Sequence, residues 1–256
     1  MLAAAHLRIR LGRRVILDGV DFAAAPGAMP AIVGPNGSGK TTLLRALTGE
    51  IAPEAGRIAL AGRDIAGLRP VELAGRRGVL AQATGLAFPF TVHEVVRLGQ
   101  QSGFATAPSV EAALEAVDLP GFGGRFYQEL SGGEQQRVQL ARVLAQVWAP
   151  VVDGEPRWLF LDEPVASLDI GHQIGMMRLA QGYAARGGGV VAVMHDLNLT
   201  AMFADHVVLL HGGRVLGAGR PEEVIRDDLL AEAYGCRLRV GQAPPGGPFV
   251  LPQSVL

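Results

Sequence analysis

The sequence predicts an α/β protein with a largely parallel sheet, joined by an antiparallel β subdomain and an inserted α-helical subdomain. The apolar runs at 158–161 and 190–194 are continuous, which is typical of parallel strands covered on both faces. Residues 1–30 instead alternate apolar and polar side chains around short turns, as antiparallel strands do. Helical periodicity dominates residues 88–150 and predicts the inserted lobe.

The remaining elements follow from the same patterns, taken in chain order. Further short strands, bounded by glycine, proline or polar residues, are expected at 29–33, 58–60 and 79–81, with a closing hairpin at 207–215. Apolar periodicity predicts helices at 41–47, 92–98, 110–117 and 133–148. We expect one domain over 1–240, with the lobe at about 86–155, and a weakly ordered tail rich in proline and glycine over 241–256.

The composition limits the class of protein. A net charge of −1 gives no electrostatic reason to expect a nucleic-acid partner or an anionic membrane surface. No run approaches the roughly 20 apolar residues that cross a bilayer, so we expect a soluble chain that acts at a membrane only through a partner. The chain holds 22 arginines but one lysine, Lys40, and that position is expected to need a compact point charge.

The pattern Gly34-Pro35-Asn36-Gly37-Ser38-Gly39-Lys40-Thr41 lies between a predicted strand and a predicted helix, the context of a phosphate-binding loop. Backbone N–H groups and the helix N-terminus surround the β-phosphate. Lys40 is expected to bridge the β- and γ-phosphates of ATP, and the Thr41 hydroxyl to bind Mg²⁺. The pattern alone could arise by chance in a glycine-rich chain, but its context and the unique lysine favour a P-loop NTPase (RecA-like) core.

Polar residues follow the two buried runs and the short strand at 79–81. Asp162 is expected to hold Mg²⁺, and Glu163 to act as general base toward the attacking water, because ligands bind at this edge of open α/β sheets. His195 is expected to contact the γ-phosphate, and Gln82 to offer its amide to Mg²⁺ or to the water. The alternative for Asp162 and Glu163 is a structural acidic turn after a strand. The alternative for His195 is an ordinary polar residue at a strand end. The other histidines show no metal spacing and are interpreted as surface or packing residues: His6, His93, His172, His206 and His211.

The segment Leu130 to Arg137 opens a helix. Ser131 and Glu134 have the spacing of a capping box. This is compatible with a well-capped helix alone, but Gly132 and Gly133 at a helix start also present N–H donors to an anion. Two anion sites that cannot share a nucleotide within one chain can share one across a dimer.

Six ordered motifs resemble those of the ATP-binding cassette family: Gly34 to Thr42, Gln82, Leu130 to Arg137, Asp162-Glu163, Ser167-Leu168-Asp169 and His195. The resemblance implies a head-to-tail homodimer that holds each ATP between the phosphate loop of one subunit and Ser131, Gly132, Gly133 and Glu134 of the other. Asp169 would communicate across that interface. It also implies two transmembrane permease subunits, a periplasmic substrate-binding protein and a place on the cytoplasmic face of the inner membrane.

Finer similarity, in residues 86–99 and in the long segment 145–158, is to the ATP-binding subunits of iron-chelate importers, most closely those for hemin. Siderophore and cobalamin importers are the alternatives. Leu11 stands where the family usually stacks an aromatic ring on adenine, and Val165 where a threonine is common. Two other classes fit the sequence less well than an importer subunit. A small-molecule kinase would not need the second anion site. An ATP-binding cassette ATPase of DNA repair would carry a long coiled-coil insertion, and one of translation would carry a second cassette.

Overall fold

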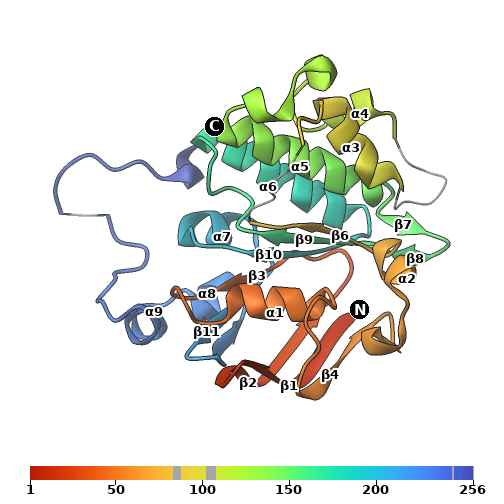
Figure 1. The fold of residues 1–256 in the computed structure, drawn as a ribbon. Helices are drawn as coiled ribbons and strands as arrows, with labels where there is room; N and C mark the ends of the chain where they lie inside the picture. Colours follow the sequence, from red (N-terminus) through yellow and green to blue (C-terminus); the bar gives the residue numbers. More distant parts are fainter. Residues whose placement is uncertain (83–87, 102–107, 244, 256) are drawn as a thin grey trace.

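The computed structural model describes residues 1–82, 88–101, 108–243 and 245–255, and every structural statement below concerns these residues. A six-stranded sheet lies at the centre, in the order β12-β11-β3-β10-β9-β6 (Figure 1). Its strands are parallel except β12, which pairs antiparallel with β11. They are β3 (Pro30–Val33), β6 (Arg77–Leu80), β9 (Trp158–Asp162), β10 (Gly189–Val193), β11 (His206–His211) and β12 (Arg214–Gly219).

A second sheet is antiparallel and comes from the N-terminal part of the chain, in the order β2-β1-β4-β5. The long strand β1 pairs with both β2 and β4. This confirms the antiparallel edge sheet predicted from the alternating pattern, and it places the predicted strand at 58–60 in the same sheet. The strands are β1 (Leu2–Leu11), β2 (Arg14–Ala24), β4 (Ala55–Leu60) and β5 (Arg63–Asp64).

Helices cover both faces of the central sheet. Helix α1 lies between the two sheets, while α5 and α6 cover the opposite face of the central sheet, with α3 and α4 outside them (Figure 1). The helices are α1 (Lys40–Leu47), α2 (Pro70–Ala74), α3 (Val92–Gln101), α4 (Val110–Glu115), α5 (Gly132–Gln146), α6 (Ile170–Ala185), α7 (Leu197–Phe203), α8 (Pro221–Val224) and α9 (Asp227–Tyr234). This arrangement is the predicted α/β class with its two additions.

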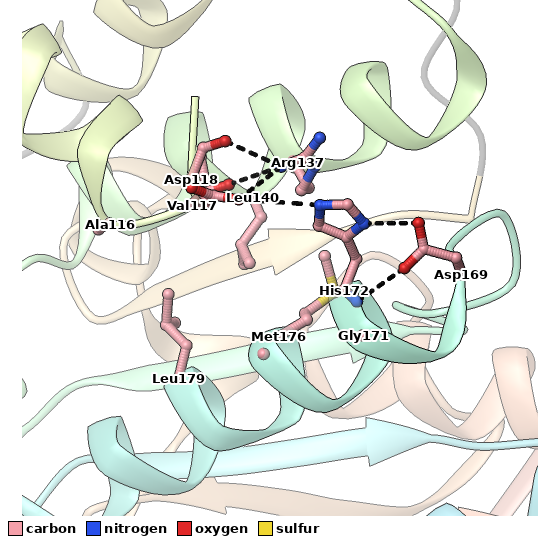
Figure 2. A pocket seen from close by; sticks show the side chains of 11 residues that line it. Ala116, Val117, Asp118, Arg137, Leu140, Asp169, Gly171, His172, Met176 and Leu179 are labelled. Atoms are coloured by element: carbon pink, nitrogen blue, oxygen red, sulfur yellow. Dashed lines mark hydrogen bonds and ion pairs between the residues drawn. The ribbon is translucent and has the colours of Figure 1, made fainter. Parts of the chain in front are cut away.

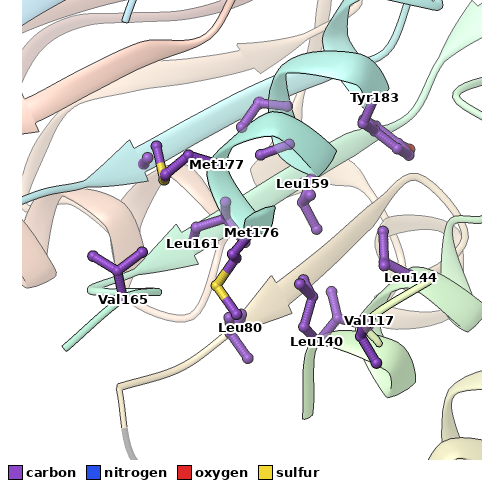
Figure 3. Packing of buried hydrophobic residues seen from close by; sticks show 14 of the residues in the cluster. Leu80, Val117, Leu140, Leu144, Leu159, Leu161, Val165, Met176, Met177 and Tyr183 are labelled. Carbon is purple, nitrogen blue, oxygen red and sulfur yellow. The ribbon is translucent and has the colours of Figure 1, made fainter. Parts of the chain in front are cut away.

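The alternation of side chains along the central strands divides the core in two. Along β9, Trp158 and Phe160 join the cluster that surrounds α1, whereas Leu159 and Leu161 join the cluster that contains α5 and α6 (Figure 3). All five residues of β9 and all five of β10 are buried. Burial on both faces is why these strands read as continuous apolar runs, and the two strands are parallel as predicted.

The predicted helical lobe is present as α3, α4 and α5, but it has no separate core. Val95 and Val96 of α3 belong to the same cluster as Leu80 of β6 and Leu159 of β9. The lobe boundary expected at residue 86, and the first two residues of the segment 86–99, lie outside the described residues. The segment 145–158 ends α5 and then forms a small hairpin, β7 (Val151–Val152) with β8 (Glu155–Pro156), which the sequence pattern does not predict.

Several predicted boundaries differ from the structure. β6 ends at Leu80, before Ala81 and Gln82, and α5 ends at Gln146, before Trp148. Helix α6 carries little amphipathic signal, because three glycines interrupt it and its apolar residues are spread around it. The tail is not wholly free of the fold, since Pro252 is buried and the Gln253 amide donates to the Asn198 carbonyl at 3.1 Å.

The closest packing in the lobe is between α3 and α5, at Gly99. We expect Gly99→Ala to destabilise the fold by about 1–3 kcal/mol, because a Cβ there would overlap the carbonyl oxygen of Arg142. Gly175→Ala, in α6, is the matched control: its Cβ would meet open space, so it should stabilise by about 0.5–1 kcal/mol. Thermal unfolding measures both, and a Gly99→Ala protein as stable as the parent would show that the helices are not this close.

Candidate functional site

The loop between β3 and α1 has the backbone of an anion cradle. Gly34, Gly37 and Gly39 all have positive φ, at 145°, 77° and 105°. A side chain at Gly34 would collide with the carbonyl of Leu210 on the neighbouring strand β11. The start of α1 carries neither a side-chain cap nor an acidic residue in its first turn. These features leave the positive end of the helix dipole for an anionic ligand.

Two polar side chains of this loop are buried. The Ser38 hydroxyl has no hydrogen-bond partner among the described residues. Lys40 is 6% exposed, and its Nζ donates to the carbonyls of Gly34 at 2.9 Å and Pro35 at 3.1 Å. Burial lowers the pKa of Lys40, while the nearby carboxylates of Glu163 and Asp162 oppose that shift. The unique ammonium therefore lies over the loop as the sequence predicts, close to the two acidic residues.

The end of β9 brings the acidic pair to the same place. Asp162 is 4% exposed, and burial, followed by the charge of Glu163, raises its pKa. The hydroxyl of Thr41 donates to Oδ1 of Asp162 at 3.3 Å, which joins the first turn of α1 to the end of β9. The site therefore contains a carboxylate and a hydroxyl side by side, 121 residues apart in the chain.

These oxygens fit a Mg²⁺ ion. Adjacent ligands of an octahedral Mg²⁺ lie about 3 Å apart, since its bonds are about 2.1 Å long, and the Thr41 and Asp162 oxygens are 3.3 Å apart. Within the described ranges no three His, Cys, Asp or Glu side chains gather as a metal site. A few protein ligands completed by water and phosphate are what Mg²⁺ prefers. Thr41 and Asp162 would hold the ion, and it would neutralise phosphate charge.

Glu163 is the centre of a second set of contacts. Its Oε2 accepts from the Gln82 amide at 2.8 Å, and its Oε1 lies 2.5 Å from Nε2 of His195. The side chain is 13% exposed. Its backbone has φ 52°, which is uncommon for a residue with a side chain. Three residues predicted separately at three strand ends thus form one cluster, with a carboxylate held from both sides.

Gln82 contacts Glu163 in this structure through its amide nitrogen. It also lines a cleft of about 310 Å³ together with Thr41 and Asp162. Its carbonyl oxygen forms no hydrogen bond with any described residue. The structure therefore supports the expected position of Gln82, and its contact with Glu163 was not part of the sequence prediction.

The segment at Ser131 forms the capping box predicted for it. Ser131 Oγ accepts from the Glu134 N–H at 3.3 Å, and the Glu134 carboxylate accepts from the Ser131 N–H at 2.8 Å. The Ser131 hydroxyl also donates to the Glu134 carboxylate at 2.7 Å, and this bond, followed by the one from the Ser131 N–H, lowers the pKa of Glu134. No hydrogen bond among the described residues uses the N–H groups of Gly132 or Gly133, which agrees with an open N-terminus on α5.

Helix α5 begins with the motif Ser131 to Glu134, and we call it the signature helix and that motif the signature. The signature does not complete the phosphate loop of its own chain. Its start lies instead against the turn that follows Glu163: a Cβ at Gly133 would lie 3.1 Å from the Ser167 carbonyl oxygen. Farther along α5, the Gln136 amide donates to the Pro164 carbonyl at 3.3 Å. The structure thus brings Lys40, Thr41, Asp162, Glu163, His195 and Gln82 together and leaves Ser131 to Glu134 as a separate surface.

Sequence reasoning missed residues that hold this site in shape. Gln136 ties α5 to the acidic turn, and the Asp196 carboxylate accepts from the N–H groups of Asn198 and Leu199 at the start of α7. The second has a recognisable signal, since an Asp before an apolar run is a helix N-cap. Leu11 is 46% exposed at the end of β1, and Val165 is buried in the core.

Comparison with known proteins identifies the class. The model of the ABC transporter family matches residues 17–166. The chain is 59% identical over 259 residues to the "Hemin import ATP-binding protein HmuV" of Rhizobium meliloti (strain 1021), covering 99% of each chain. It is 62% identical over 255 residues to the protein of the same name from Jannaschia sp. (strain CCS1), covering 98% of this chain and 94% of that one.

Solved structures agree. The dimeric post-hydrolysis structure of the ATP-binding cassette MJ0796 with ADP and Pi has TM-score 0.74 and 26% identity, over 86% of this chain and 99% of that one. The ADP form of the cassette MJ1267 has TM-score 0.77 and 25% identity, over 91% and 98%. The chain belongs to the ABC transporter family. It is an ATP-binding ATPase whose hydrolysis is coupled to transport.

Because Glu163 is the acidic group held between Gln82 and His195, we expect Glu163→Gln to lower ATP turnover about 100-fold or more. The amide keeps the shape of the side chain but cannot accept a proton. Steady-state phosphate release and binding of labelled ATP measure the two effects separately, and binding should remain. Glu155→Gln, in the β7–β8 hairpin, is the control and should turn over like the parent; a Glu163→Gln enzyme that did the same would rule out the base.

Proposed function

We propose that this chain is the energy-coupling ATPase of a bacterial importer for hemin, bound to the cytoplasmic face of the inner membrane. The observation that carries the choice of solute is the end-to-end identity, at 59–62%, with relatives named hemin import ATP-binding proteins. No described helix is long and apolar enough to cross a bilayer. The proposal includes two transmembrane permease subunits that carry the solute, one for each copy of the ATPase in a dimer.

The first step is ATP binding. The loop from Gly34 to Thr42 surrounds the phosphates with N–H groups, and the Lys40 ammonium exchanges its carbonyl partners for β- and γ-phosphate oxygens. Thr41 and Asp162 would hold Mg²⁺, and Gln82 would join them through its carbonyl oxygen, which forms no hydrogen bond with any described residue. Burial, followed by the charge of Glu163, raises the pKa of Asp162, and a bound cation would favour the charged form of this carboxylate.

The second step is hydrolysis. Glu163 accepts a proton from the attacking water, and His195 contacts the γ-phosphate and orients the water. In the structure Nε2 of His195 lies 2.5 Å from Oε1 of Glu163, so the two side chains contact one another. Substrate binding must therefore turn His195 toward the phosphate, while Gln82 keeps hold of the carboxylate.

The third step needs a second copy of the chain. Ser131, Gly132, Gly133 and Glu134 lie on a surface apart from their own phosphate loop, with free N–H groups at the start of α5. In a head-to-tail homodimer they would face the γ-phosphate held by the partner subunit. The neighbour MJ0796 has been solved as a dimer, and it shares this fold at TM-score 0.74.

The surface that meets the permease is proposed to lie at the start of α3. Phe88 and Phe126 are large apolar side chains left 68% and 46% exposed there. The Gln128 amide donates to the Phe88 carbonyl at 3.4 Å, so the two segments lie together. Exposed aromatic groups of this kind mark protein contacts. This surface follows Gln82 in the chain. A conformational change at the nucleotide site would therefore be coupled to the permease contact.

We expect Ser131→Arg to fold normally yet to lose more than about 90% of ATP turnover, because its bulk would fill the partner's nucleotide site. Turnover and circular dichroism measure activity and fold. Ser109→Arg is the control, since Ser109 is also a helix N-cap, on α4, and lies away from the proposed interface. A Ser131→Arg protein that turns over ATP at the parent rate would refute the shared site.

Reconstitution tests the solute. Vesicles holding the chain with its permease and binding protein should take up hemin when ATP is inside, and should not take up a ferric siderophore or cobalamin. Glu163→Gln vesicles are the control for ATP-driven uptake. Uptake of a siderophore or cobalamin in place of hemin would replace the proposed solute and leave the importer ATPase in place.

A further inference from the structure

A cavity of about 320 Å³ lies between α4, α5 and α6, away from the phosphate loop (Figure 2). Its floor is apolar, from side chains such as Leu140 and Met176. Four polar residues line one side of it. Asp118 and Arg137 come from the helical lobe, while Asp169 and His172 come from the start of α6, in the turn that follows the acidic pair.

His172 holds both oxygens of the Asp169 carboxylate. Its backbone N–H donates to Oδ1 at 3.0 Å, and its Nδ1 lies 2.8 Å from Oδ2. The first contact caps α6. The second is additional, since a cap needs only the backbone bond. Among the described residues nothing else hydrogen-bonds this carboxylate, whose side chain is 71% exposed.

The other ring nitrogen of His172 faces the helical lobe. Nε2 lies 3.8 Å from Oδ2 of Asp118, and the same oxygen lies 3.6 Å from Nη1 of Arg137. Arg137 also donates to the Asp118 carbonyl at 2.9 Å. Asp118 has φ 58°, so this bond fixes an uncommon backbone conformation at the end of α4. Arg137 lies on α5, the helix that begins at Ser131.

We infer that His172 is a positioning residue that links Asp169 to Asp118, so that the signature helix and the Asp169 turn of one subunit move as one body. The link rests on the proposed shared-site dimer, in which both elements meet the partner. The sequence pattern suggests that His172 is a surface or packing residue, and the structure adds that this partly exposed side chain lies between two carboxylates. Joining the two elements would let nucleotide at one site set the geometry presented to the other.

Substitutions of His172 can remove its contact with Asp169 and its contact with Asp118 separately. In His172→Asn the carboxamide nitrogen takes the place of Nδ1, so the contact with Asp169 remains and Asp118 is out of reach. In His172→Gln the nitrogen takes the place of Nε2, and the contact with Asp118 remains. His172→Ala loses both. If the link is what matters, all three should lower kcat about three- to ten-fold. Their melting temperatures should stay close to the parent's, because exposed ion pairs contribute little to stability.

A double-mutant cycle on kcat tests the coupling. Asp118→Ala should lower kcat about as much as His172→Ala, and the double variant should be no slower than either single one. Glu115→Ala, an exposed acid at the end of α4, is the matched control and should be unchanged. The link would be overturned if His172→Ala, His172→Asn or His172→Gln kept the parental kcat. It would also be overturned if the losses in kcat of the two single alanine variants were additive in the double variant.

The same proteins in a Glu163→Gln background separate this inference from the proposed function. There ATP should still produce a dimer with each His172 variant, measured by sizing chromatography. If Glu163→Gln alone fails to dimerise with ATP, the shared site is wrong. If it dimerises and the His172 variants keep parental kcat in the active background, only the link is wrong.

Discussion

The position of β9 between β6 and β10 is the constraint on which the site depends. The register pairs Asp162 with Val193 and Leu161 with Leu80, so three strands end at one level. Residues just beyond those ends, Gln82, Glu163 and His195, therefore meet although 113 residues separate the first from the last. The Glu163 N–H donates to the Val193 carbonyl at 3.1 Å while its φ is 52°, so the chain leaves the strand with its carboxylate turned into the site. Burial on both faces of β9 fixes this register, because a slip by one residue would exchange its two core faces.

Much of this arrangement was predictable, because the signals are local. Continuous apolar runs identify parallel strands, three glycines and a lysine identify the phosphate loop, and Ser131 with Glu134 identifies the start of α5. Polar residues at parallel strand ends must share an edge, so the clustering of Asp162 and His195 followed from the topology alone. What the sequence could not supply depends on tertiary contacts. The bond from Gln82 to Glu163, and the contacts of His172 with Asp169 and Asp118, join residues whose spacing carries no pattern. Helix α6 was not predicted, because its glycines and scattered apolar residues give no helical periodicity.

The same constraint bears on the proposal that one chain holds only part of the nucleotide site. The turn after Glu163 runs directly under the start of α5, through Gln136 and Pro164. That packing places the start of α5 against the turn that follows Glu163, and no hydrogen bond among the described residues uses the N–H groups of Gly132 or Gly133. In the proposed dimer, a second copy turned head to tail would supply the missing part of each site. The apolar cluster that joins the lobe to the sheet is continuous from β9 to α3.

The central claim is that each nucleotide site is shared between two copies. Mixing two defective proteins, both in the Glu163→Gln background, tests it most directly: Lys40→Ala lacks a working phosphate loop and Ser131→Arg lacks a working signature. Alone, neither should dimerise with ATP. Together they should, since the loop of the second protein and the signature of the first make one intact site, and sizing chromatography with labelled ATP should show a dimer that retains about one nucleotide. Retention of ATP-dependent dimers by either variant alone, at the level of the mixture, would contradict the shared site.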